Sequence, residues 1–320
     1  MNKNLLLKEL LDSEIVLVDG GAKGGTKELP KLAPFIKVHA FEPHPAEAEL
    51  LRKNILLQKK FSKYLIHDAA LSDKEGAADF NMMNNASMSS LLDPDFENYH
   101  LHFGMMHGFP EWKNNIIVKE KVKVKTSTLD SFTNENNIQQ IDFLKLDTQG
   151  NELKILNGAK NLLENHLISV IKTEVAFVPV YKSQCLFSEM DIFLRNHDMQ
   201  YVDCLFYENK IFKKIKIGNY LIPEDASRYS SLGDAVYIIN IEKVNPEKKK
   251  GIALKTGMIL AEMNYKSIAF DFLHVYAQLE EKAAINLIRF LSKRNFRQQM
   301  KLTIKNWCPP KLLYILKNIL

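Results

Sequence analysis

The sequence of 320 residues is poor in cysteine: only Cys185, Cys204 and Cys308 are present, and no two of them form a CxxC pair. Neither a disulfide framework nor a cysteine-based zinc site is supported, so a reducing, cytoplasmic environment is expected. Long apolar runs are also missing, because no stretch approaches the roughly 20 apolar residues that a membrane span needs. A composition of 46% hydrophobic and 25% charged residues is instead typical of a globular protein.

The dinucleotide-binding fingerprint GxGxxG is missing as well, although a glycine-rich loop of another kind is present. The apolar run that starts at Ile15 ends on Asp19, and glycines follow within residues 20–25, GGAKGG. Glycine permits a tight turn and a close ligand, and a helix expected after the loop would offer free N–H groups and a positive dipole. Glu42 ends the next predicted strand, at the spacing of an acid that binds a ribose diol.

Two classes of ligand fit this loop. A dinucleotide would bring a pyrophosphate, which Asp19 would repel, whereas S-adenosylmethionine would bring an ammonium and a sulfonium, which Asp19 would attract. The loop therefore favours S-adenosylmethionine. An NAD-dependent sugar oxidoreductase on a similar fold stays an alternative, as does a binding module that keeps the cofactor without catalysis. An ordinary glycine turn is the third alternative.

Short apolar runs alternate with helical patterns through the first 240 residues, which predicts a parallel sheet flanked by helices. The predicted strands are Ile15–Asp19, Lys37–Glu42, Tyr64–Ala69, Asp142–Asp147, Ser169–Val175 and Ala235–Ile241. The predicted helices are Ala46–Leu57, Glu152–Leu163 and Ser188–His197, and Ser127 is expected near the start of a further helix.

The stretch DFLKLDTQGNELKILNGAKNLL, Asp142–Leu163, closely resembles the most recognisable motif of the FkbM-type methyltransferases. Other segments agree and come in the family's order over residues 14–241: VDGGAKGG, FEPHP, ALSDKEG, ASMSSLL, TSTLDSF, KTEVAFVPVYKSQCLFSEMDIFL and GDAVYII. The resemblance implies an α/β, class I Rossmann-like fold with a doubly wound, mostly parallel sheet and helices on both faces. It also implies S-adenosylmethionine as cofactor and methyl transfer to a hydroxyl, which we expect on a sugar, a glycan or a related metabolite.

The resemblance places the cofactor-binding residues at the ends of the first three strands. They are Asp19, Gly21, Ala22, Gly25, Glu42, Asp68 and Ala69. Asp19 and Gly21 are expected near the methionine end and the ribose, and Glu42 would accept the ribose hydroxyls. The family often has Asp-Val-Gly-Ala-Asn in the first loop, whereas Gly20 and Lys23 replace the Val and the Asn here.

Charged residues interrupt two strands that are otherwise apolar. Lys145 and Asp147 alternate on one strand, and Lys172 and Glu174 on the next, so each pair shares one face. A strand inside a parallel sheet is normally apolar on both faces, so Lys145 and Asp147 either pair with each other or with Glu174, or they serve the site. We expect Asp147 or Glu174 to be the general base and the other to orient the acceptor. No metal site is predicted.

Residues 81–115 break the alternation and show no clear period, so this segment is expected to be mobile or functional. A histidine within it, His100, His102 or His107, is an alternative base, because imidazole titrates near neutral pH. The other interpretation is that the segment only covers the site. Two roles for Tyr181 stay open: it lines the acceptor pocket, or it only packs in the interior.

The C-terminal part differs in charge from the rest. Residues 248–320 contain 14 Lys or Arg and 4 Asp or Glu, whereas residues 1–247 contain 29 and 34. We therefore divide the chain into a methyltransferase domain, 1–245, and a basic helical extension, 246–320.

Arg289, Lys293, Arg294 and Arg297 fall mostly on one helical face. The extension is open to three interpretations. It makes peripheral contact with the inner face of a membrane, it forms a homodimer through its apolar face, or it is a helical cap whose charged face is solvated. Nucleic acid is not an expected partner, because aromatic residues are not interleaved with the basic ones as a stacking surface would require.

Overall fold

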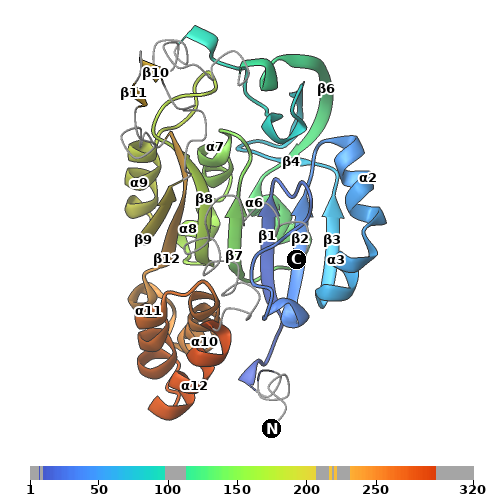
Figure 1. Ribbon diagram of the computed structural model, residues 1–320. Helices are drawn as coiled ribbons and strands as arrows, with labels where there is room; N and C mark the ends of the chain where they lie inside the picture. The colour runs from blue at the N-terminus through green and yellow to red at the C-terminus, as the bar shows by residue number, and fades with distance from the viewer. Residues whose placement is uncertain are drawn as a thin grey trace, which may run out of the picture.

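The computed structural model has a seven-stranded sheet as its centre, with the strand order β3-β2-β1-β7-β8-β12-β9 (Figure 1). The structure describes Leu7 and residues 10–97, 113–206, 216–217, 220–221 and 231–292, without the side chains of Ile55, Leu57, Gln58 and residues 216, 217, 220 and 221. His100, His102, His107, Lys293, Arg294 and Arg297 lie outside the described residues.

Each predicted strand is confirmed, with ends that shift by at most three residues. They are β1 Ile15–Gly20, β2 Ile36–Phe41, β3 Lys63–His67, β7 Ile141–Leu146, β8 Ile168–Ala176 and β12 Leu232–Ile239, and the seventh strand of the sheet, β9 Met199–Phe206, was not predicted. The first five run parallel, and β12 is antiparallel to both of its neighbours. The strand order reverses between β1 and β7, and ligands of such sheets bind beyond the carboxyl ends of the strands at this point.

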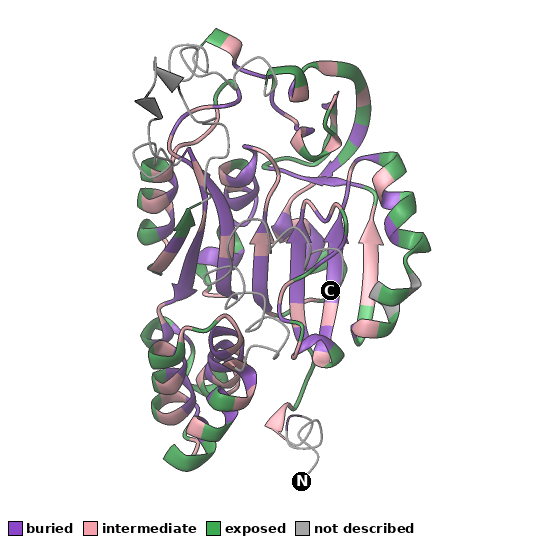
Figure 2. Cartoon of the chain, in the orientation of Figure 1, coloured by how far each residue is buried: buried purple, intermediate pink, exposed green. Residues whose placement is uncertain are grey.

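Helices cover both faces of the sheet, as expected of a doubly wound fold. Leu17 of β1 belongs to one apolar cluster and Val18 to the other, because successive side chains of a strand point to opposite faces. The first cluster includes residues of α10 Pro246–Glu262, α11 Lys266–Asp271 and α12 Glu281–Ser292, which follow the predicted boundary at 246. The second includes residues of α6 Leu129–Glu135, α7 Glu152–Asn157, α8 Lys160–Glu164 and α9 Phe187–Asn196. Figure 2 shows that the central strands of the sheet are largely buried.

Two predicted helices are split. Ala46–Leu57 becomes α2 Pro45–Lys53 and α3 Ile55–Lys60, and Glu152–Leu163 becomes α7 and α8. The second break falls at Gly158, the C-cap of α7, where glycine is required because an added Cβ would lie 2.3 Å from the Ser72 carbonyl oxygen. The predicted start of α6 is also wrong by one residue, since Thr128 caps it by accepting from the Ser131 N–H.

The helix expected after the glycine loop is absent. Residues 21–35, which connect β1 to β2, contain only the 3-10 turn η1, Ala33–Phe35. Parallel strands are usually joined through an α-helix, so this connection is unusual. The N-terminal dipole that the sequence predicted for the loop is therefore not available to a ligand.

A second sheet was not predicted. It has the order β4-β6-β5 and consists of β4 Ala70–Leu71, β5 Gly76–Met83 and β6 Val118–Ser127. Figure 1 shows it beyond the upper ends of β1, β2 and β3. In the part of the chain that the structure describes, we find no helix with the length and apolar character to span a membrane.

Candidate active site

A cavity of about 270 Å³ lies at the carboxyl ends of the central strands. Six of the predicted site residues line it: Asp19, Gly21, Gly25, Glu42, Ala69 and Asp147. Lining residues that were not predicted include Lys27 and Glu28 from the β1–β2 connection, and Phe80, Ser87, Ser89 and Leu91 from the second sheet and the loop after it. The second sheet thus forms one wall of the cavity.

Three predicted site residues do not line the cavity. Ala22 is buried in the core cluster, and its N–H donates to the Phe41 carbonyl. Asp68 is exposed and forms an ion pair with Arg52. Glu174 lies behind the lining, next to Asp147.

Gly21 is required by a contact between two strand ends. Its φ is +83°, and an added Cβ would lie 1.9 Å from the Asp147 carbonyl oxygen. The sequence suggested that glycine makes room for a ligand, but at this position the close neighbour is the end of β7. Gly24 has a φ of +73° with nothing within 4 Å of an added Cβ, so it serves only the turn.

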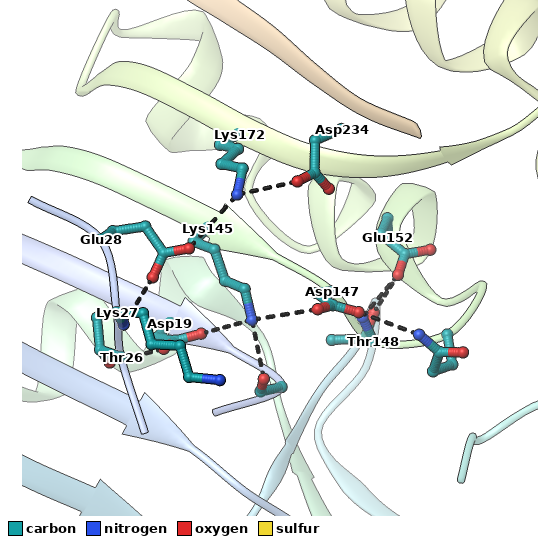
Figure 3. A network of polar contacts seen from close by, with 12 residues as sticks. Asp19, Thr26, Lys27, Glu28, Lys145, Asp147, Thr148, Glu152, Lys172 and Asp234 are labelled. Carbon is teal, nitrogen blue, oxygen red and sulfur yellow. Dashed lines mark hydrogen bonds and ion pairs between the residues drawn. The ribbon is translucent and has the colours of Figure 1, made fainter. Parts of the chain in front are cut away.

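Asp19 and Lys145 form a buried ion pair below the loop (Figure 3). The Asp19 carboxylate is 1% exposed, lies 3.1 Å from the Lys145 ammonium and accepts from the Thr26 hydroxyl at 2.6 Å. Burial raises the pKa of Asp19, and Lys145 opposes the shift. Lys145 also donates to the Gly21 carbonyl at 2.9 Å. The charge of Asp19 is thus largely balanced within the protein.

A second lysine lies directly opposite the first on the neighbouring strand. Lys145 of β7 and Lys172 of β8 are register partners, and like charges in such a position repel. The Lys172 ammonium lies 2.9 Å from Asp234 and 3.4 Å from Glu28, which offset this repulsion (Figure 3). Carboxylates and ammonium groups from five segments, β1, the β1–β2 connection, β7, β8 and β12, therefore line this part of the cavity.

Gln149 joins the two predicted catalytic carboxyl groups. Its side-chain amide donates to Asp147 at 3.0 Å and to Glu174 at 3.2 Å, and its oxygen accepts from the Tyr181 hydroxyl at 3.1 Å. Burial, together with Asp147 and Glu152 nearby, raises the pKa of Glu174 well above its usual value. The sequence analysis missed Gln149, although it lies within the motif that carries the resemblance.

The turn after β7 is held by Glu152, which is also a residue that the sequence did not single out. One oxygen of its buried carboxylate accepts from the Thr148 N–H at 2.7 Å and from the Thr148 hydroxyl at 3.0 Å. The N–H of Gly150 lies 3.3 Å from the same oxygen. Glu152 therefore fixes the backbone that presents Asp147 to the cavity.

Glu42 lines the cavity from the end of β2. Its side chain is 4% exposed, and one oxygen accepts from the His44 N–H at 2.9 Å. Burial raises its pKa to about 7. A carboxyl group at this position can accept hydrogen bonds from a diol, most strongly when it is ionised.

The loop fits S-adenosylmethionine better than a dinucleotide. A pyrophosphate needs free N–H donors, but the N–H groups of Gly21 and Ala22 donate to the Phe41 carbonyl and that of Gly25 to Ala22. Lining carboxyl groups, among them Glu42 and Asp147, suit a cofactor with hydroxyl, ammonium and sulfonium groups. No cluster of three or more potential metal ligands occurs among the residues that the structure covers.

Comparisons with known proteins agree with the resemblance. The family model described as "Methyltransferase FkbM domain" matches residues 27–201, more than half of the chain. The chain is 25% identical over 177 residues to the 2-O-methyltransferase NoeI of Sinorhizobium fredii (strain NBRC 101917 / NGR234). That match covers 53% of this chain and 66% of NoeI, slightly under two thirds of its length.

Similar solved structures are distant. Magnesium protoporphyrin IX methyltransferase (ChlM) of Synechocystis PCC 6803, with bound SAM, is 9% identical, with a TM-score of 0.37 over 74% of each chain. TrmK of M. capricolum in complex with S-adenosyl-homocysteine is 11% identical, with a TM-score of 0.32 over 90% of this chain and 94% of that one. The identification follows from the family match: the chain belongs to the FkbM family of S-adenosylmethionine-dependent methyltransferases.

Proposed function

We propose that this methyltransferase acts on a hydroxyl oxygen of a sugar or glycan, with Asp147 as the general base. The observation that carries the proposal is the position of Asp147, whose carboxylate lines the cavity at the end of β7. The distant similarity of the chain to NoeI, a 2-O-methyltransferase, supports an oxygen acceptor.

The bound cofactor would supply a methyl group on a sulfonium, which makes the methyl carbon electrophilic. Asp147 would take the hydroxyl proton as the new O–C bond forms and the S–C bond breaks. The Gln149 amide and the Glu152-held turn keep the Asp147 carboxylate in place, so little reorganisation is needed at that step. Glu42 would accept the ribose hydroxyls of the cofactor.

The test is transfer of a tritiated methyl group from S-adenosylmethionine to a panel of methyl hexosides and 6-deoxyhexosides. Asp147→Asn preserves the shape of the side chain but not its basicity, so kcat should fall about 100-fold or more. The affinity for S-adenosylhomocysteine, measured by calorimetry, should change little. The labelled position is then read by mass spectrometry.

Glu174→Gln is the matched control, because its amide oxygen can still accept from Gln149. It should keep most of the activity. If Glu174→Gln is inactive and Asp147→Asn is active, then the base is Glu174. If S-adenosylhomocysteine binds but no glycoside is labelled, then the proposed sugar acceptor is wrong.

A further inference from the structure

The connection between β1 and β2 has one part in the cavity and another against the C-terminal helices. Lys27 and Glu28 line the cavity, and Glu28 reaches the Lys172 ammonium at 3.4 Å. Because residues 21–32 contain no helix, few of their backbone groups are paired within the segment itself. Its conformation therefore depends on partners from elsewhere in the chain.

At the cavity side, Thr26 supplies the anchor. Its hydroxyl donates to the Asp19 carboxylate at 2.6 Å, and its N–H donates to the Tyr64 hydroxyl at 3.2 Å. Asp19 lies in β1 and Tyr64 in the edge strand β3, so this anchor comes from the sheet itself.

At the other side, the anchor comes from the C-terminal helices. The two carboxylate oxygens of Glu262, the last residue of α10, accept from the Lys31 N–H at 2.5 Å and the Leu32 N–H at 3.0 Å. The Lys31 ammonium donates to the carbonyls of Phe290 and Leu291 in α12 at 3.0 and 2.7 Å. These contacts join the β1–β2 connection to the last described turn of α12.

Apolar contacts support the same junction. Leu29 and Leu32 are buried in one cluster with Leu287 and Leu291 of α12. Leu29 has a φ of +49°, a conformation that a branched side chain adopts only where its surroundings hold it. This strained residue immediately follows Glu28 in the cavity wall.

We propose that Glu262 is a positioning residue for the cofactor, so that the C-terminal helices form part of the cofactor site. The helices hold the β1–β2 connection in the conformation that presents Lys27 and Glu28, taking over the task of the missing crossover helix. If the connection is correctly placed in only a fraction of molecules, then the apparent Kd rises by the inverse of that fraction. The proposal depends on the cofactor site alone and not on the acceptor.

The test compares two variants of α10 by calorimetric titration of the full chain with S-adenosylhomocysteine. Glu262→Gln replaces one acceptor by a donor, so the Lys31 and Leu32 N–H groups cannot both be satisfied. Lys255→Met is the matched control, because Lys255 ties the same helix to the Glu14 carbonyl at 2.8 Å and to Asp142 at 3.4 Å. Asp142 lies at the amino end of β7, away from the cavity.

Glu262→Gln should raise the Kd about fivefold or more, which is the lower end of a typical coupling between sites. Lys255→Met should lower the Tm and leave the Kd within about twofold. The proposal is overturned if both variants weaken binding equally for a given loss of Tm, or if Glu262→Gln binds as the unchanged protein does.

Hydrogen exchange of the unchanged protein gives a second readout. Since coupling is reciprocal, S-adenosylhomocysteine should slow exchange of the Lys31 and Leu32 amides and of peptides from α10 and α12. A control peptide from α9, on the opposite face, should not respond. Protection confined to β1, β2 and β7, with none in α10 or α12, would contradict the proposal.

Discussion

At the scale of single residues, the buried ion pair of Asp19 and Lys145 is the feature of the site whose loss should destabilise the fold most. Asp19 is 1% exposed, and among the described residues Lys145 is the one cation that forms an ion pair with it. Breaking a buried pair by removing one partner leaves an uncompensated charge, which costs far more than the pair itself contributes.

Lys145→Met should therefore lower the free energy of unfolding by about 3–5 kcal/mol, measured by urea denaturation at pH 7. Adding Asp19→Asn should restore a large part of this loss, because the uncompensated carboxylate is then gone. A single variant within about 0.5 kcal/mol of the unchanged protein would show that water or another group balances Asp19.

The sequence indicated most of these residues and the ion pair of Lys145 with Asp147, which the structure has at 3.6 Å, but not the closer pair of Lys145 with Asp19 at 3.1 Å. Lys145, Asp147, Lys172 and Glu174 stood out because charges are rare on strands buried on both faces. That Lys145 pairs with Asp19 depends on the register between β1 and β7, and no local pattern contains it. Gln149 was missed for a similar reason. No sequence pattern distinguishes an uncharged side chain in a turn, and its three hydrogen-bond partners are brought together only by the fold.

At the scale of elements, two of the predictions that failed are helices next to glycines: the helix predicted through Gly158 and the helix predicted after the glycine loop. Helical periodicity runs through Gly158 without interruption, but the helix ends there, where the Ser72 backbone packs so closely that it leaves no room for a side chain. The second sheet could have been predicted, since Val122 and Val124 alternate with lysines on β6. The missing crossover helix could not, because its substitute comes from residues more than 200 positions later.

Gly21→Ala and Gly24→Ala make a matched pair in one loop. Both glycines have a positive φ, so either alanine should cost about 1–2 kcal/mol of folding free energy for the left-handed conformation. At Gly21 the overlap with the Asp147 carbonyl should add roughly 1–3 kcal/mol. Urea denaturation of the two variants measures the difference, and equal losses would mean that the end of β7 can move away.

Gly21→Ala should also weaken cofactor binding, since the displaced backbone carries Asp147. Calorimetry with S-adenosylhomocysteine should show a larger Kd for Gly21→Ala than for Gly24→Ala. If the affinities are equal, then the position of the β7 end does not matter for the cofactor.

At the scale of the whole molecule, buried carboxyl groups link folding to pH. Burial raises the pKa of Glu42 to about 7 and that of Asp142 to about 6, from ordinary values of 4.5 and 3.8. Below the ordinary values both the folded and the unfolded chain are protonated, and the stabilisation from the raised pKa is fully present. As the pH rises through the folded-state values this stabilisation is lost. His39 acts oppositely, since burial lowers its pKa to about 3, so its contribution is lost as the pH falls below 6.5.

Glu42 can be separated from the other groups by substitution. The unchanged protein should lose stability relative to Glu42→Gln as the pH rises from 5 to 8, by up to about 3 kcal/mol for a shift of this size. An ionised carboxylate accepts stronger hydrogen bonds from ribose hydroxyls than a protonated carboxyl group does, so the affinity for S-adenosylhomocysteine should rise through pH 7 in the unchanged protein and stay flat in the variant. Unfolding free energies and calorimetric Kd values at each pH measure both effects. A difference in stability that is constant with pH would mean that Glu42 is ionised throughout, and its carboxylate would then be available to the diol at every pH tested.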